Sequence, residues 1–353
     1  MSVARMKDGK RWYCFVRYKD WKGQTKQHKK EGFRRKSDAQ AYEREFRQRV
    51  SGAPEITVGS MYTIYMEDCV SRLRPSTVQT KKDLFKHHIL PDFADVPISA
   101  ISPATVRQWQ NALLQKGLKP STLRMINGQL SALLNFAVKF YGLANNPCKL
   151  AGQIGSLKTE DMKIWTPEQF DAFFSALRDH TARALFHLLY WSGLRIGEAM
   201  ALTPGDFEFS VPSVRVTKTY HRIDGRDVIT PPKTPKSERT VILTRESSEL
   251  MQRYISTLFD CDKDTRIFGL RSMTWYRVQL KKGCTAAGLE PIRIHDFRHS
   301  HASLLIELGY SPLLIAERLG HEHADTTMRT YSHLYPNKQK DLIERLDRLK
   351  KDH

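Results

Sequence analysis

The chain has 353 residues, with 57 Lys and Arg against 38 Asp and Glu and a formal net charge of +19. This length exceeds one hydrophobic core of common size, so we expect two or three domains. The apolar fraction of 40% suffices to build cores and excludes disorder throughout the chain. The positive charge favours a polyanion as partner, because clustered cations attract phosphate and release its counterions.

The sequence argues against a membrane or secreted protein. No apolar run approaches the roughly 18 residues of a spanning helix, and the start MSVARMKDGKRWY lacks the apolar segment of a secretion signal. We therefore expect a cytoplasmic protein without a membrane partner. The five cysteines lie far apart with no Cys-x-x-Cys pair, which predicts neither a thiolate zinc site nor a disulfide framework.

The first 52 residues form a basic module, with 16 Lys and Arg against 6 Asp and Glu. The segments 3–6 and 11–19 flank Asp8-Gly9, a dipeptide that suits a tight hairpin turn, so a pair of strands is predicted. A third strand is expected over 24–31. The domain boundaries expected from these patterns are 1–52, 56–150 and 160–353.

A helix should complete the basic module. Ser37, with Gln40 three residues later, has the pattern of a capping box, and an apolar stripe follows at Tyr42, Phe46 and Val50. A sheet with one face covered by this helix would leave the other exposed, and such a face can lie in a DNA major groove. The candidate DNA-binding residues on it are Arg17, Lys19, Lys26, Lys29 and Lys30. A merely solvated basic surface is the alternative.

Residues 56–150 are predicted to form a helical domain after a linker, SGAPEIT, at 51–57. Capping and proline signals at Ser102-Pro103 and Pro120-Ser121 mark two helix starts. The four expected helices are Val58–Arg72, Thr77–Leu90, Pro103–Lys116 and one that begins after Pro120-Ser121 and ends before Asn146-Pro147. Contacts to backbone phosphate are expected from Lys81, Lys82 and Arg124, although charges on outer helix faces are also typical of plain solvation.

A third domain follows a second linker at 150–162. It starts with a capped helix at Thr166-Pro167-Glu168-Gln169, and residues 211–243 contain short alternating β runs. The predicted fold class is therefore α+β and multidomain. It comprises a three-stranded sheet with one helix, a helical domain, and a mainly helical domain with a small antiparallel sheet.

Nucleotide hydrolysis, zinc proteolysis and serine-hydrolase chemistry lack their usual motifs. The sequence contains no phosphate-cradling glycine loop, no His-Glu-x-x-His and no Gly-x-Ser-x-Gly. The third domain instead spreads cations, imidazoles and one phenol over distant segments: Arg195 in SGLRIGEAMAL, Lys233 in PPKTPKSERTV, His295 and Arg298 in IRIHDFRHSH, His321 in LGHEHADTT, and Tyr331 in TYSHLYP.

This ordered set resembles the motif of tyrosine recombinases of the phage-integrase family, which join and excise mobile DNA at specific sites. Single pieces such as His-x-x-Arg are weak signals, but six residue types in order around a predicted hairpin are specific. The resemblance covers essentially the whole chain, with 1–52 similar to an arm-type domain and 56–150 to a core-binding domain. It implies strand exchange without metal, ATP or other cofactor, in a bacterial or phage-encoded, nucleoid-associated enzyme. The implied partners are double-stranded attachment sites of core and arm type, a homotetramer around a Holliday junction, and an accessory DNA-bending or directionality protein.

Chemistry supports a role for each residue. A phosphodiester resists attack because its nonbridging oxygens are negative, so fixed donors must take up that charge. Arginine binds two oxygens and stays charged, which suits Arg195 and Arg298 as a clamp on the scissile phosphate. The resemblance assigns Tyr331 as the nucleophile that forms a 3′-phosphotyrosyl link. Because the ordinary phenol pKa is about 10, a base must help, and His295 is the candidate.

The departing 5′ oxygen needs a proton. Lys233, which matches the hairpin lysine of the family, is predicted to supply it, with Lys236 as the alternative. His321 is expected to hydrogen-bond a nonbridging oxygen, and Glu198 to orient neighbouring groups rather than to react.

The histidine clusters HDFRHSH and GHEH raise a zinc site as an alternative, because histidine alone can hold zinc. The adjoining Arg298 and the lack of a carboxylate or thiolate ligand argue against it. The other histidines are interpreted as structural or surface groups, namely His299, His301, His323 and His333. Tyr335, four residues after Tyr331, is the competing nucleophile.

Two other functions fit parts of the sequence. A type IB topoisomerase-like relaxase would use the same catalytic residues without choosing a site, and a DNA-binding regulator would keep the fold without the chemistry. The separate basic module favours site choice, and the six residue types favour catalysis. Within 337–353, an apolar stripe predicts docking on a neighbouring subunit or back on its own domain; it comprises Leu342, Ile343, Leu346 and Leu349.

Overall fold

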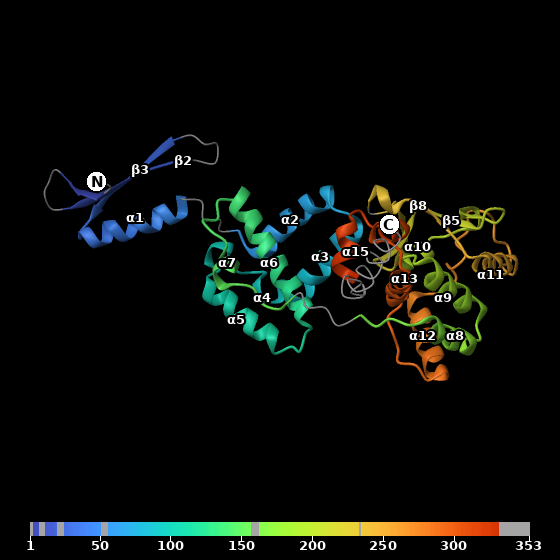
Figure 1. Cartoon of the computed structure of the whole chain (residues 1–353). Coiled ribbons are helices and arrows are strands. Elements are labelled where there is room, and N and C mark those ends of the chain that lie inside the picture. Colours follow the sequence, from blue (N-terminus) through green and yellow to red (C-terminus); the bar gives the residue numbers. More distant parts are fainter. Residues whose placement is uncertain are drawn as a thin grey trace, which may run out of the picture. The chain divides into compact units, whose positions relative to one another are not determined.

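The computed structural model describes residues 3–6, 11–19, 25–50, 56–156, 162–232 and 234–331. The chain divides into two compact units, Met1–Glu160 and Asp161–His353 (Figure 1). Small antiparallel sheets occur in a helical majority, so the predicted α+β class is confirmed. All five cysteines are free thiols.

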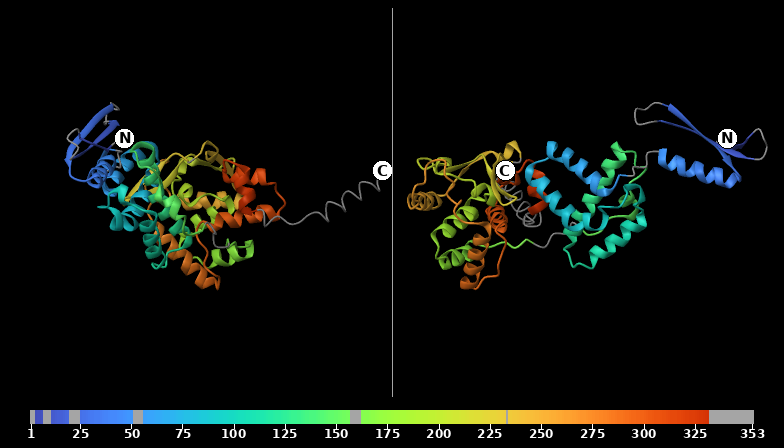
Figure 2. Two further views of the ribbon diagram at one scale, coloured as in Figure 1. Left: turned by 90° about the vertical axis from the view of Figure 1, so that its left-hand side faces the viewer. Right: turned by 180° about the vertical axis from the view of Figure 1, so that it is seen from behind.

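The first unit begins with an antiparallel sheet in the order β1-β2-β3, followed by one helix (Figure 2). The elements are β1 (Val3–Arg5), β2 (Trp12–Lys19), β3 (Thr25–Phe33) and α1 (Lys36–Val50). Strand alternation directs Val3, Cys14 and Val16 to the face on which α1 packs, where Ala39 joins them in a small core. The third strand starts one residue later than predicted and extends two residues further.

The start of α1 differs from the prediction. Ser37 is the second residue of the helix, and its hydroxyl donates to Asp38 Oδ1 over 3.3 Å. Ser37 is therefore inside the first turn and is not the N-cap of a capping box. Of the predicted stripe, Tyr42 packs against the small core, whereas the side chains of Phe46 and Val50 lie outside the described residues.

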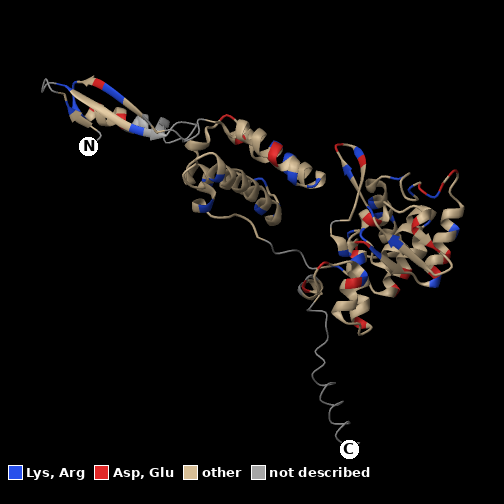
Figure 3. Ribbon diagram, turned by 90° about the horizontal axis from the view of Figure 1, so that it is seen from above, with Lys and Arg blue, Asp and Glu red and all other residues tan. Residues whose placement is uncertain are grey.

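The register of the sheet places the predicted basic residues on two different faces. Lys29 pairs with Phe15, and Arg17 lies two residues along the same strand, so these positions share the outer face. Lys30 pairs with the buried Cys14 and belongs to the helix-bearing face, where its Nζ lies 4.4 Å from the Tyr42 ring centre. The expectation of one common face is therefore wrong for Lys30. The side chains of Lys19 and Lys26 lie outside the described residues. Figure 3 shows Lys and Arg positions of the described strands in blue.

The described residues 56–156 of the first unit are mostly helical, as predicted. The four expected helices are α2 (Val58–Arg72), α3 (Pro75–His88), α5 (Pro103–Leu114) and α6 (Pro120–Phe140); shorter turns are α4 (Leu90–Phe93), η1 (Ile98–Ala100) and α7 (Pro147–Ala151). Side chains of Thr57 and Ser102 cap α2 and α5. α3 begins two residues before its predicted start, because Pro75 suits the first helical turn.

The second unit packs helices around aromatic side chains. Its helices are α8 (Pro167–Ala176), α9 (His180–Ser192), α10 (Ile196–Ala199), α11 (Arg245–Ser256), α12 (Met273–Ala287), α13 (Asp296–Glu307), α14 (Pro312–Leu319) and α15 (Ala324–Tyr331), with 3₁₀ turns η2 (Pro204–Asp206) and η3 (Pro235–Ser237). The predicted capping box at Thr166 and Gln169 is formed. Phe170 stacks on Tyr190 with ring centres 4.1 Å apart, and Phe297 of α13 is fully buried in the same core. This core fixes α13 against α8 and α9.

Among the described residues of the second unit, the β residues form two small sheets rather than one. The three-stranded sheet has the order β4-β5-β8, and the separate hairpin pairs β6 with β7. The strands are β4 (Phe207–Glu208), β5 (Ser213–Val216), β6 (Thr219–Ile223), β7 (Arg226–Thr230) and β8 (Arg239–Ile242). The hairpin turn, Asp224-Gly225, has positive φ at both residues, as a tight two-residue turn requires.

Candidate active site

Arg298 is held by the ends of two helices. Its side chain is buried, with Nη1 donating to the Gly193 carbonyl and Nη2 to the Leu319 carbonyl, both over 2.7 Å. Those carbonyls lie at the C-terminal ends of α9 and α14, where unpaired helix carbonyls favour a cation. Burial, followed by the charge of Arg195, lowers the pKa of Arg298 to about 9, which leaves it charged at neutral pH. The guanidinium therefore has a fixed orientation.

Arg195 forms an ion pair at the start of α10. Its Nη1 donates to Glu198 Oε1 over 2.7 Å, and its Nη2 donates to the Gly320 carbonyl over 3.3 Å. The Glu198 carboxylate also accepts from Arg239 Nη2 over 3.0 Å and from the Arg195 backbone. Burial alone would raise the pKa of Glu198, but Arg239, Arg195 and Arg298 outweigh it and hold that pKa below its ordinary value. Glu198 thus orients its neighbours as a charged group.

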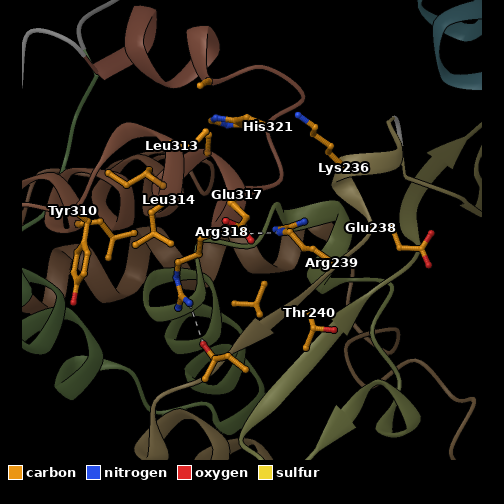
Figure 4. Close-up of a pocket in the computed structure, with 16 residues that line it drawn as sticks. Lys236, Glu238, Arg239, Thr240, Tyr310, Leu313, Leu314, Glu317, Arg318 and His321 are labelled. Atoms are coloured by element: carbon orange, nitrogen blue, oxygen red, sulfur yellow. Dashed lines mark hydrogen bonds between the residues drawn. The ribbon is translucent and has the colours of Figure 1, made fainter.

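A groove of about 1040 Å³ lies between the η3–β8 segment and α14, and His321 borders it. Lys236 lines the same groove, and in Figure 4 its side chain extends toward the side on which His321 lies. His321 Nδ1 lies 2.7 Å from Thr327 Oγ1. Burial, then the charges of Arg298 and Arg195, lower the pKa of His321 to about 4, so the imidazole is neutral at neutral pH. Lys233 lies outside the described residues.

Tyr331 is the last residue of α15, and its side chain is 1% exposed. It packs against Ala302, Ile306 and Leu319, among other apolar side chains, while its hydroxyl lies 2.7 Å from His299 Nδ1. Burial raises the pKa of Tyr331 to about 12, although Arg298 and Arg195 act in the opposite direction. The phenol is therefore protonated and enclosed in this arrangement.

The two arginines influence each of the other described groups of the motif. Beside their action on His321 and Tyr331, Arg298 and Arg195 contribute to a lowered pKa of His295. His295 is exposed, yet protein surrounds much of its ring. This partial burial is the main reason that the pKa of His295 falls to about 4, and the neighbouring His299 lowers it further. The structure thus brings five of the six predicted groups into one electrostatic neighbourhood of the second unit.

Comparisons with known proteins agree along the chain. The model described as "Phage integrase family" matches residues 163–338, "Phage integrase, N-terminal SAM-like domain" matches 57–114, and "Arm DNA-binding domain" matches 1–50. The ICEBs1 integrase of Bacillus subtilis (strain 168) is 32% identical over 321 residues, which cover 87% of each chain. The chain belongs to the phage integrase family. It is a tyrosine recombinase, an enzyme that cleaves and rejoins DNA.

Other integrases share the fold at lower identity. A tyrosine recombinase XerC-like protein of Caldanaerobacter subterraneus is 24% identical, covering 84% of each chain. The Tn1549 transposon integrase in complex with a circular intermediate DNA aligns with a TM-score of 0.69 at 20% identity, over 83% of this chain and 99% of that one. A lambda integrase dimer bound to a core site aligns with a TM-score of 0.62 at 15% identity, over 96% of this chain and 95% of that one.

The three basic side chains predicted to contact phosphate in the helical part differ in burial and in hydrogen-bond partners. Lys82 is exposed and Arg124 is half-buried. Lys81 Nζ, in contrast, donates to the Tyr65 hydroxyl over 2.8 Å and to Gln129 Oε1 over 2.7 Å, and partial burial lowers its pKa. Lys81 therefore already has protein partners, and its contact with DNA stays a prediction, like those of Lys82 and Arg124.

The structure adds residues to the integrase site that sequence reasoning left aside. His299 was interpreted as structural or surface, yet it contacts the Tyr331 hydroxyl. Arg239 binds Glu198 and also donates from Nε to the Arg318 carbonyl. A helical wheel could have shown that His299 shares a face with His295, since four residues separate them. His301 is buried and accepts from Arg318 Nε, and His323 is exposed. His333 and Tyr335 lie outside the described residues.

Two further features concern metals and membranes. Among residues 3–331 that the structure describes, no three His, Cys, Asp or Glu side chains gather as a metal ion would require. Within the same described ranges, none of the helices combines the length and apolar character needed to cross a bilayer.

Proposed function

We propose that this integrase is the site-specific recombinase of a mobile element, which integrates and excises that element through a 3′-phosphotyrosyl intermediate and a Holliday junction. The observation that carries the proposal is the position of Tyr331, whose hydroxyl lies 2.7 Å from Nδ1 of His299, the residue that directly follows Arg298 on α13. A nucleophile and two fixed cations beside each other are what attack on a phosphodiester requires.

Each group has a step in this reaction. Arg195 and Arg298 bind the nonbridging oxygens of the scissile phosphate, and His321 donates a hydrogen bond to one of them. Tyr331 gives its phenolic proton to a histidine base and attacks phosphorus, the P–O5′ bond breaks, and Lys233 or Lys236 protonates the departing oxygen. The phosphotyrosyl bond conserves the energy of the ester, so that a 5′ hydroxyl of the partner duplex can reverse the step without ATP or metal.

The organisation of the chain supports recognition of two kinds of DNA site. We assign 1–52 to arm-type DNA, 56–150 to core-site DNA and 160–353 to catalysis. The match of 1–50 to an arm DNA-binding domain favours site choice over relaxation of supercoils by a topoisomerase-like enzyme. Because the substrate is double-stranded DNA, the enzyme would work in the cytoplasm at the nucleoid. We further propose a homotetramer during exchange, because a lambda integrase tetramer bound to a Holliday junction has a similar fold (TM-score 0.58). An accessory DNA-bending or directionality protein would complete the assembly.

A nicked suicide substrate carrying the attachment site tests the proposal. The intact enzyme should form a covalent protein–DNA adduct that resists denaturant, and it should do so in EDTA. Tyr331→Phe removes the nucleophilic oxygen and should abolish the adduct while site binding persists. An adduct that survives this substitution would point to Tyr335 instead, whereas plasmid relaxation without any attachment site would favour the relaxase.

A further inference from the structure

The hydroxyl of Tyr331 has a specific partner in the enclosed arrangement. His299 Nδ1 lies 2.7 Å from it, a distance typical of a strong hydrogen bond. Burial is the first cause that lowers the pKa of His299, so its imidazole is neutral at neutral pH. In the tautomer that carries its proton on Nε2, the neutral imidazole accepts a hydrogen bond at Nδ1, and the phenol is then the donor. Proton acceptor and proton donor therefore already face each other.

His295, the base expected from the sequence, lies beside His299. Its ring centre lies 4.9 Å from that of His299, and the hydrogen bond described for the Tyr331 hydroxyl goes to His299. The other charged groups near His299 are Asp296, which raises its pKa, and Arg293 and Arg298, which lower it. His299 also directly follows Arg298 on α13, so the proton acceptor and one arm of the phosphate clamp belong to one rigid element.

We propose that His299 is a catalytic residue that accepts the phenolic proton of Tyr331 during strand cleavage. This inference rests on the proposed recombinase function. The O–H bond of Tyr331 breaks as an N–H bond forms at His299 Nδ1, and the phenol oxygen bonds to phosphorus while the P–O5′ bond breaks. The 5′ oxygen takes its proton from the separate lysine acid, and rejoining returns the proton from His299 to Tyr331.

The acidities require the proton transfer to accompany attack. The phenol in its buried position is a much weaker acid than the imidazolium of His299, so a free phenolate would be rare in the resting site. General base catalysis removes the proton while the new bond forms, and it typically contributes about 10²–10⁴-fold to a rate.

His299→Asn tests the role in the full chain. The Asn amide oxygen can accept the hydrogen bond of the phenol but cannot take its proton. We expect single-turnover cleavage of the suicide substrate to fall by about 10²-fold or more, with unchanged binding to the site. His299→Gln provides a second variant of different length. His323→Asn is the matched control, because His323 is exposed on the neighbouring segment, and it should cleave at the wild-type rate.

A more acidic nucleophile separates proton transfer from simple support of structure. Fluorinated tyrosine at position 331 needs less help in losing its proton, so it should restore much of the rate of His299→Asn. A substrate with a bridging 5′ sulfur bypasses the lysine acid, and His299→Asn should stay slow on it. Equal or faster cleavage by His299→Asn, or a defect that fluorotyrosine leaves unchanged, would overturn the inference. The wild-type adduct and its loss in Tyr331→Phe would be unaffected by that outcome, so the proposed function is judged separately.

Discussion

Glu198 supplies the counter-charge that allows several arginines to share one site. A phosphate clamp needs unbalanced positive charge, but buried cations without a partner destabilise a fold. The Glu198 carboxylate accepts from the Arg195 side chain at 2.7 Å and from the Arg239 side chain on both oxygens, at 3.3 Å and 3.0 Å. Arg298 uses backbone carbonyls instead. The site thus keeps a net positive charge for DNA while its most buried cations are satisfied.

Glu198→Gln should lower the free energy of unfolding by about 3 kcal/mol at pH 7, because it leaves buried Arg239 without an anion. The pKa of Glu198 is held low in the folded state, so this stabilisation exists above the ordinary carboxyl pKa of 4.5 and is lost as the pH falls through the folded value. Urea unfolding at pH 7 and at acid pH measures both effects. Glu249→Gln, in an exposed pair with Arg253, is the control and should cost less than about 0.5 kcal/mol.

His301 should make the protein sensitive to acid. Burial lowers its pKa to about 3, so the unfolded chain binds a proton that the folded chain excludes, and stability is lost as the pH falls from about 6.5 toward 3. The contribution is at most about 1.4 kcal/mol per pH unit. Unfolding measured from pH 7 to 4 should show a shallower loss for His301→Gln, whereas the exposed His87→Gln should follow the wild type. Parallel curves for wild type and His301→Gln would rule out this role.

The ordered residue types were readable from sequence, but their contacts were not. Arg195, Arg298 and His321 could be selected because each stands in a motif with a defined chemical role. His299 has no such signature, and its contact depends on where α15 returns to α13, which is a matter of tertiary packing. Lys29 and Lys30 lie on opposite faces because of the sheet register. An error of one residue in a predicted register would exchange the two faces.

Among the elements, two helix ends organise the site. α9 and α14 both end in a glycine with left-handed backbone, Gly193 and Gly320, and the carbonyls there accept from Arg298 and Arg195. The sequence predicted the starts of α8 and α5, because Thr166 and Ser102 have capping side chains with a local pattern, whereas the cap expected at Ser37 was wrong. It did not predict that the β residues of 207–242 divide into a three-stranded sheet and a separate hairpin, because strand pairing depends on distant partners.

Gly320→Ala should impair cleavage. Its φ of 67° strains an L side chain, and a Cβ there would lie 3.0 Å from Arg239 side-chain atoms. We expect a loss of about 1–2 kcal/mol in unfolding free energy together with slower adduct formation. Gly288→Ala is the matched control, because Gly288 ends α12 at a φ of 68° with open space around the site of its Cβ. It should lose similar stability but cleave normally; equal cleavage by both variants would contradict the role of Gly320.

At the scale of the whole molecule, charge and chemistry are placed in different segments. The first 52 residues carry 16 Lys and Arg against 6 Asp and Glu, whereas the predicted catalytic groups all follow residue 194. We therefore expect affinity for arm-type DNA and reactivity toward phosphate to be separable by truncation.

Deletion of residues 1–52 should weaken binding to arm-type DNA and flatten its salt dependence. The slope of log K against log salt should become shallower by about 0.9 for every phosphate that the basic module neutralises in the full chain. Fluorescence anisotropy over a range of NaCl concentrations measures the slope, and the suicide substrate measures core-site cleavage, which should persist. An unchanged slope on arm DNA would show that the basic module does not bind phosphate.

The two oxygens that hold Arg298 belong to the peptide backbone, at Gly193 and Leu319. Exchange of a side chain at either position cannot delete them. A Cβ at Gly193 would lie 2.6 Å from His301 and 2.8 Å from Leu319 side-chain atoms, so a substitution there would act by shifting the main chain. For anyone who retargets the enzyme by laboratory evolution, the consequence is practical. We expect the orientation of Arg298 to tolerate substitution of exposed residues around it, because main-chain carbonyls hold its guanidinium.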